Sequence, residues 1–113
     1  MITIYHNPRC QKSRTALHHI ESLDKDIKIV EYLKDPPTAK ELKEVLQLLQ
    51  LKPIDIVRKK EPLFVHAYKD GSYTDAQWLK ILVENPILIE RPIVIKGNKA
   101  FIARDEISLN TIK

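Results

Sequence analysis

The chain has 113 residues, 43% hydrophobic and 30% charged, which is typical of one globular domain rather than a disordered chain. The net charge of +4 comes without a long basic run, so we expect a solvated surface and no nucleic-acid binding. No apolar stretch approaches the roughly 20 residues that span a bilayer. Because no basic leader starts the sequence either, we expect no signal peptide, no membrane association and a cytoplasmic location.

The first third of the chain predicts a strand, a helix and a second strand. Residues 2–6 are mostly β-branched or aromatic and end at an Asn-Pro pair, which is typical of a strand. From Ser13 onward, apolar residues recur at helical spacing. They are Ala16, Leu17, Ile20 and Leu23. A second strand is expected around residues 27–30, and the Asp-Pro-Pro run at 35–37 ends it.

Two capping boxes predict helices in the middle of the chain. Thr38 precedes Glu41 by three residues, and Thr74 precedes Gln77 in the same way, so each Thr and its partner can satisfy backbone N–H groups reciprocally. The predicted inward positions are Leu42, Val45, Leu46 and Leu49 in the first helix and Leu79, Leu82 and Val83 in the second. Between them, Pro53 opens a short helix and residues 70–71, Asp-Gly, predict a turn.

The C-terminal part predicts a β-hairpin. Residues 93–95 and 100–102 are apolar and flank Gly97-Asn98, with a loop that we expect to be longer than a two-residue turn. A short helix is expected from about Asp105. The resulting order of strand, helix, strand, helical middle, strand, strand and helix predicts a single α/β domain over residues 1–113, with a mixed sheet.

Cys10 is the residue with the clearest chemical signal. A lone cysteine is generally a small buried hydrophobe, but every other residue from 9 to 14 is polar or charged. Cys10 also stands where a strand ends and a helix begins, and unpaired N–H groups with the positive end of the helix dipole favour a thiolate there. Arg9, Lys12 and Arg14 add positive charge. Such settings lower a thiol pKa from ~8.5 to roughly 3.5–7.5, so Cys10 is the candidate nucleophile.

Familiar cysteine motifs are excluded. Ser13, three residues after Cys10, rules out a C-x-x-C dithiol, and Ala16, six residues after it, rules out the C-x5-R phosphatase loop. No Cys/His cluster has zinc spacing. Ser13 either donates a hydrogen bond to the thiolate or is simply polar in the first helical turn, and His6 either tunes the thiol or ends the strand.

The residues around Cys10 resemble the active-site motif of the glutaredoxin-coupled arsenate reductase (ArsC-type) family. This motif reads Tyr5-His6-Asn7-Pro8-x-Cys10-x-x-Ser13-Arg14. Residues 58–62 (RKKEP) and 85–94 (NPILIERPIV) are similar to the stretches that carry the family's first two substrate-binding arginines, here Arg58 and Arg91. Arg104 aligns with the third, although its neighbours depart from the usual pattern. Arg9 and Lys12 resemble the YfgD-like subgroup most.

The resemblance implies a thioredoxin-like fold with a mixed four-stranded sheet, a helical insertion after the second strand and a cis-proline at Pro92. It makes Cys10 the nucleophile. It assigns support of the thiolate to His6, Ser13 and Arg14, and arsenate binding to Arg58, Arg91 and Arg104. Arginine suits the last role because its planar guanidinium stays charged and pairs with oxyanions bidentately.

The resemblance further implies reduction of arsenate to arsenite through a Cys10 thiolate–arsenate adduct, with glutathione as co-substrate and glutaredoxin as partner. The single cysteine independently supports an external thiol, because the chain has no resolving residue. We expect no bound cofactor, no metal and a monomer.

Two alternatives stay open at this point. One is an Spx-type regulator that binds RNA polymerase, although Ser13 replaces the second cysteine of its usual C-x-x-C switch. The other is a family member that acts on a different oxyanion or thiol substrate, because fold and motif do not determine the physiological substrate.

Overall fold

The computed structural model describes residues 2–23 and 26–103. The chain divides into two compact units, one made of Met1–Asp35 with Arg91–Lys113 and the other of Pro36–Glu90. Arg104 and the helix expected from about Asp105 lie outside the described residues. No helix in the described part of the chain is long and apolar enough to cross a bilayer.

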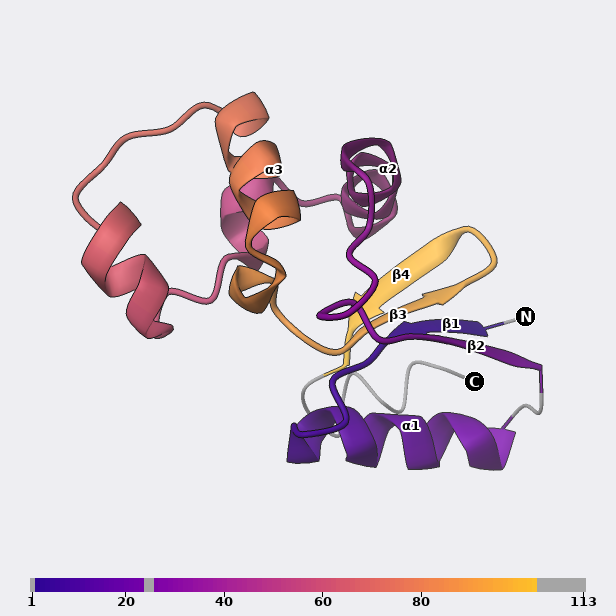
Figure 1. The fold of residues 1–113 in the computed structure, drawn as a ribbon. Coiled ribbons are helices and arrows are strands. Elements are labelled where there is room, and N and C mark those ends of the chain that lie inside the picture. The colour runs from indigo at the N-terminus through magenta and orange to yellow at the C-terminus, as the bar shows by residue number, and fades with distance from the viewer. Residues whose placement is uncertain (1, 24–25, 104–113) are drawn as a thin grey trace. The chain divides into compact units, whose positions relative to one another are not determined.

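The first unit contains a mixed four-stranded sheet (Figure 1). Its strands are β1 (Ile2–Tyr5), β2 (Ile27–Val30), β3 (Ile93–Lys96) and β4 (Lys99–Ile102). The spatial order is β2-β1-β3-β4, with β1 parallel to β2, antiparallel to β3, and β3 antiparallel to β4. The predicted α/β class, mixed sheet and thioredoxin-like topology are therefore confirmed.

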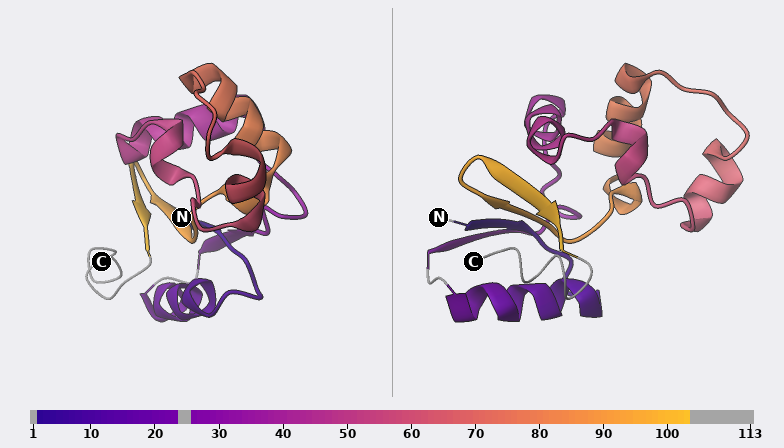
Figure 2. Two further views of the ribbon diagram at one scale, coloured as in Figure 1. Left: turned by 90° about the vertical axis from the view of Figure 1, so that its left-hand side faces the viewer. Right: turned by 180° about the vertical axis from the view of Figure 1, so that it is seen from behind.

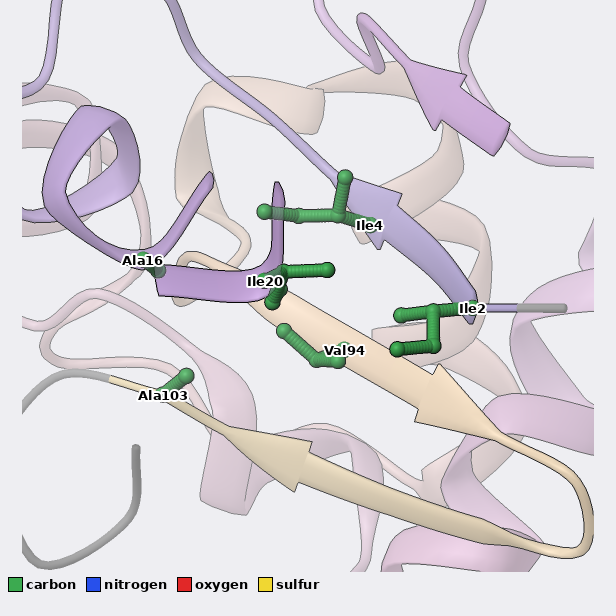
Figure 3. Close-up of a cluster of buried hydrophobic side chains, with 6 residues drawn as sticks. All are labelled: Ile2, Ile4, Ala16, Ile20, Val94 and Ala103. Atoms are coloured by element: carbon green, nitrogen blue, oxygen red, sulfur yellow. The ribbon is translucent and has the colours of Figure 1, made fainter. Parts of the chain in front are cut away.

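Helix α1 (Gln11–Leu23) covers one face of this sheet, as both views of Figure 2 show. It begins at Gln11, directly after Cys10, which confirms the expected helix start there; the helical spacing of apolar residues indicated it only from Ser13 onward. Side chains from β1, α1, β3 and the residue after β4 meet between the helix and the sheet (Figure 3). The fully or almost fully buried members are Ile2, Ile4, Ala16, Ile20, Val94 and Ala103. Alternation along β1 and helical spacing along α1 turn these residues toward a common core, which anchors both ends of the segment carrying Cys10.

The predicted hairpin is present, but the expected longer loop is wrong. Lys96 pairs with Lys99, so only Gly97 and Asn98 form the loop. Gly97 has φ 61°, the left-handed conformation that a two-residue hairpin turn requires and that glycine adopts freely. The strands extend to two lysines that the apolar pattern did not include, because backbone pairing continues past the buried residues.

The second unit is the helical insertion, which is confirmed. It contains α2 (Ala39–Leu49), the 3₁₀ turn η1 (Pro53–Ile56), the π-helical turn η2 (Phe64–Tyr68), α3 (Asp75–Glu84) and the 3₁₀ turn η3 (Pro86–Leu88). Both capping boxes form. Thr38 Oγ1 accepts from the N–H of Glu41 at 3.1 Å, and Thr74 Oγ1 accepts from that of Gln77 at 3.2 Å.

Helix α3 is rotated relative to the predicted inward face. Trp78 and Leu82 are buried, whereas Leu79 and Val83, which we expected inward, are half-buried. Trp78 packs in a cluster of aromatic rings with Phe64, Tyr68 and Tyr73. The large indole surface gains more from burial than the smaller aliphatic side chains do, so it determines which face of α3 turns inward.

Candidate active site

Cys10 occupies the N-cap position of α1. Its N–H donates to the carbonyl of Asn7 at 3.0 Å, and its carbonyl accepts the first helical hydrogen bond, from the N–H of Arg14, at 3.0 Å. The Cys10 side chain is half-buried, and the first turn of α1 has no acidic residue to offset the positive end of the helix. The thiol therefore combines partial access with a favourable field for its ionised form.

The surroundings of the thiol lower its pKa. Partial burial raises the pKa of Cys10, because burial disfavours the charged form. That effect is outweighed by hydrogen bonds from the backbone N–H of Ser13 and the side chain of Arg91, by the charge of Arg91, and by the backbone N–H of Lys12. The pKa of the Cys10 thiol thus lies below the ordinary cysteine value, as a nucleophile requires.

Arg91 reaches the thiol because of its position in the sheet. It directly precedes β3, and Ile93 of that strand pairs with Tyr5 at the end of β1. The Arg91–Pro92 peptide bond is cis. Arg91 Nε is buried and has no hydrogen-bond partner among the described residues. A buried, unpaired donor is costly, so an anion that accepted from this nitrogen would satisfy it.

Ser13 and His6 form a buried pair beneath the Cys10 turn. Ser13 is fully buried, His6 is 6% exposed, and His6 Nδ1 lies 2.6 Å from Ser13 Oγ. The same oxygen accepts from the N–H of Asn7 at 3.0 Å. Ser13 acts on the thiol through its backbone N–H, while its hydroxyl links the start of α1 to the end of β1.

The charge of His6 is also affected by this burial. Burial lowers the pKa of His6 most strongly, and the positive charge of Arg14 lowers it further, against the opposing effect of Glu31. The lowered pKa favours the neutral form of the imidazole. A neutral imidazole beside Ser13 supports the turn by hydrogen bonding rather than by charge.

Replacing Ser13 with Ala should destabilise the protein by about 1–3 kcal/mol, because the buried His6 Nδ1 and the Asn7 N–H lose their partner. The free energy of unfolding in urea measures this effect. Ser22→Ala is the matched control on an exposed position of α1 and should change stability by less than about 0.5 kcal/mol. Equal values for the two variants would contradict the role given to the Ser13 hydroxyl.

Arg14 braces the turn from outside. Its Nη1 donates to the carbonyl of Pro8 at 2.9 Å, and the side chain is otherwise exposed.

Asn7 makes three hydrogen bonds in this turn that the motif alone did not predict. Its carbonyl accepts from the N–H of Cys10, its N–H donates to Ser13 Oγ, and its Oδ1 accepts from the N–H of Arg9 at 3.0 Å. Because an Asn-Pro pair is a known turn signal, the participation of Asn7 in a turn was predictable from the sequence.

Arg58 belongs to the second unit. Its N–H donates to the carbonyl of Leu88 at 2.7 Å, which connects the segment after η1 to the segment after α3. Its guanidinium binds Glu61 at 2.7 Å and the carbonyl of Ile87 at 3.3 Å. Of the predicted site residues, the first unit thus brings together Cys10, His6, Ser13, Arg14 and Arg91. In the second unit, Arg58 has a carboxylate partner that the sequence analysis did not predict. The spacing of three residues between Arg58 and Glu61 was the available signal.

The described residues contain no group of three or more His, Cys, Asp or Glu side chains placed to hold a metal ion. The chemistry in the first unit instead centres on sulfur and guanidinium. A mixed sheet, a cis-proline before β3 and one activated cysteine at a helix N-terminus define a single-cysteine protein of the thioredoxin fold.

The chain belongs to the ArsC family, whose model matches residues 5–112. It is 37% identical over 105 residues to an arsenate reductase of Neisseria meningitidis, covering 91% of this chain and 90% of the relative. The Escherichia coli protein YfgD is 36% identical over 105 residues, covering 91% and 88%. The solved structure of an arsenate reductase from Vibrio cholerae superposes with a TM-score of 0.90 at 33% identity, covering 99% of this chain and 97% of that one. The resemblance expected from sequence is confirmed.

Proposed function

We propose that this protein reduces arsenate to arsenite, with Cys10 as the nucleophile. The observation that carries the proposal is a half-buried thiol at a helix N-terminus, with a lowered pKa and an arginine beside it. The names of the Neisseria and Vibrio relatives support arsenate as the substrate. We place the reaction in the cytoplasm, where thiols are kept reduced.

The arginines explain how an anion could approach a thiolate. Arsenate is a tetrahedral, doubly charged oxyanion, so its repulsion from the Cys10 sulfur must be offset. Arg91 supplies positive charge at the sulfur and an unpaired buried Nε. We assign the other two binding roles to Arg58 and Arg104. Arg58 would exchange the carboxylate of Glu61 for the oxyanion, and its planar fork can bind either group.

The first chemical step forms a sulfur–arsenic bond. The Cys10 thiolate attacks arsenic, and one arsenate oxygen leaves as hydroxide, or as water after it takes a proton. No electron transfer to arsenic has occurred at this stage, so the adduct still holds arsenic(V). The arginines and the N–H groups of α1 stabilise the charge that accumulates on the arsenate oxygens.

The second step needs a thiol that the chain does not contain, because Cys10 is its only cysteine. A glutathione thiolate attacks the Cys10 sulfur, a disulfide bond forms, and the sulfur–arsenic bond breaks with its electron pair moving to arsenic. Arsenic(V) is thereby reduced by two electrons to arsenite, and two thiols are oxidised to one disulfide. A glutaredoxin thiolate then removes the glutathione by thiol–disulfide exchange, which frees Cys10.

The test is an arsenite assay with purified protein, arsenate, glutathione and glutaredoxin. We expect arsenite formation that depends on the protein and falls when either reductant is omitted. Replacement of glutaredoxin by thioredoxin separates the two coupling systems. No arsenite above background with either system would overturn the proposal. If the same protein instead bound RNA polymerase in a pull-down, the Spx-type regulator would be favoured.

A further inference from the structure

A cavity of about 240 Å³ lies beside the Cys10 turn in the first unit. One wall is formed by residues 6–9, and the other by Glu31, Leu33 and Lys34 after β2. A hydrogen bond of 2.8 Å from the N–H of His6 to the carbonyl of Val30 joins the first wall to the end of β2, directly before Glu31. Arg9, which lines the cavity, directly precedes Cys10 in the chain.

The lining of this cavity combines both signs of charge with a small apolar surface. Arg9 and Lys34 are cations, and Glu31 lies 3.8 Å from Lys34 at an exposed position. Pro8 and Leu33 supply apolar contact, and Leu33 is 40% exposed although it is a leucine. Such a surface suits a ligand that carries carboxylates, an ammonium group and a short aliphatic chain.

We infer that this cavity is the binding subsite for the small carboxylated thiol that reacts with Cys10, an inference that rests on the proposed function. Glutathione has that chemistry: two carboxylates for Arg9 and Lys34, and one ammonium group for Glu31. Complete pockets for drug-sized ligands measure about 300–1,000 Å³. At about 240 Å³ the cavity accommodates part of a tripeptide.

The test uses thiol–disulfide exchange, which requires no arsenate. The Cys10 thiolate attacks one sulfur of a disulfide, a mixed disulfide forms on Cys10, and the other half leaves as a thiolate. Mass spectrometry follows the modified protein over time with two probes, glutathione disulfide and the uncharged hydroxyethyl disulfide. The substituted residue is Lys34, because its side chain is exposed and it is not next to Cys10 in the chain. The main variant is Lys34→Glu, and the neutral Lys34→Gln is a second, milder one.

Lys34→Glu should slow modification by glutathione disulfide roughly fivefold, and Lys34→Gln less, since exposed charge pairs are individually modest. Both variants should react normally with hydroxyethyl disulfide. Lys28→Glu, an exposed residue of β2 outside the cavity, carries the same change in net charge and should leave both rates unchanged.

Three results would overturn the subsite: no effect of Lys34→Glu, equal slowing with both probes, or the same slowing in Lys28→Glu. Failure of the subsite is distinguishable from failure of the proposed function. A protein that forms no arsenite but discriminates between the two disulfides retains the subsite, and one that forms arsenite without such discrimination lacks it.

Discussion

Replacement of Cys10 by Ser should reduce arsenate turnover by at least about a thousandfold, because removal of a nucleophile eliminates the covalent pathway. The hydroxyl has a far higher pKa than the thiol, so neither the N-terminus of α1 nor Arg91 can ionise it at neutral pH. No other cysteine in the chain can take over. Arsenite formation under saturating glutathione and glutaredoxin measures the loss.

The fold should survive this change. Cys10 occupies the N-cap of α1, and serine is a preferred residue at that position. The variant should therefore keep the melting temperature of the wild type or exceed it slightly, which excludes unfolding as the cause of inactivity. A folded Cys10→Ser protein that still reduced arsenate would remove the basis of the mechanism.

Replacement of Arg91 by Ala should lower kcat/KM for arsenate about 10²–10³-fold, the usual effect of removing one preorganised group that stabilises an oxyanion. Arg91→Lys should show an intermediate loss, because it restores the charge without the planar fork. Lys99→Ala, at an exposed position of β4 in the same unit, is the matched control and should be near wild type.

The Arg91→Ala variant should also shift the pH dependence of Cys10. Arg91 lowers the pKa of the thiol through its hydrogen bond and its charge, so its removal raises that pKa. Less thiolate is then present at neutral pH, and the rate of alkylation should rise only at higher pH than in the wild type. An unchanged alkylation profile would show that Arg91 does not act on the sulfur.

The sheet and the helix starts were predictable because local rules determine them. The apolar residues of β1 and β3 alternate or run together as buried strands do, and both Thr capping boxes satisfy backbone groups within four residues. The junction at Cys10 follows from an Asn-Pro turn between a strand and a helix. Each of these features depends on neighbours in sequence.

Tertiary partners were not predictable in the same way. Trp78 rather than Val83 is buried because aromatic side chains from η2 and from the segment before α3 surround it. Similarly, the link from Ser13 to His6 depends on how the Cys10 turn folds back against α1. The motif identified both residues as candidates and left the geometry of their contact open.

The candidate site shows the same division. The family motifs identify Cys10 and Arg91. The pairing of β1 with β3 explains how Arg91, 81 positions further along the chain, acts on the sulfur of Cys10. The pairing of Arg58 with Glu61 is a feature that no single-residue role predicts. Under the proposed function, Arg58 must separate from Glu61 before it can bind an oxyanion, and the cost of that separation weakens the binding.

The most direct test of the central claim is the pH dependence of Cys10 alkylation by iodoacetamide in the wild-type protein. Because Cys10 is the only cysteine, every modified molecule reports on this sulfur. We expect a midpoint below the value of ~8.5 for an unperturbed thiol, because the N–H groups of α1 and Arg91 favour the thiolate. A midpoint at or above that value would show that the sulfur is an ordinary thiol and would contradict the proposed chemistry.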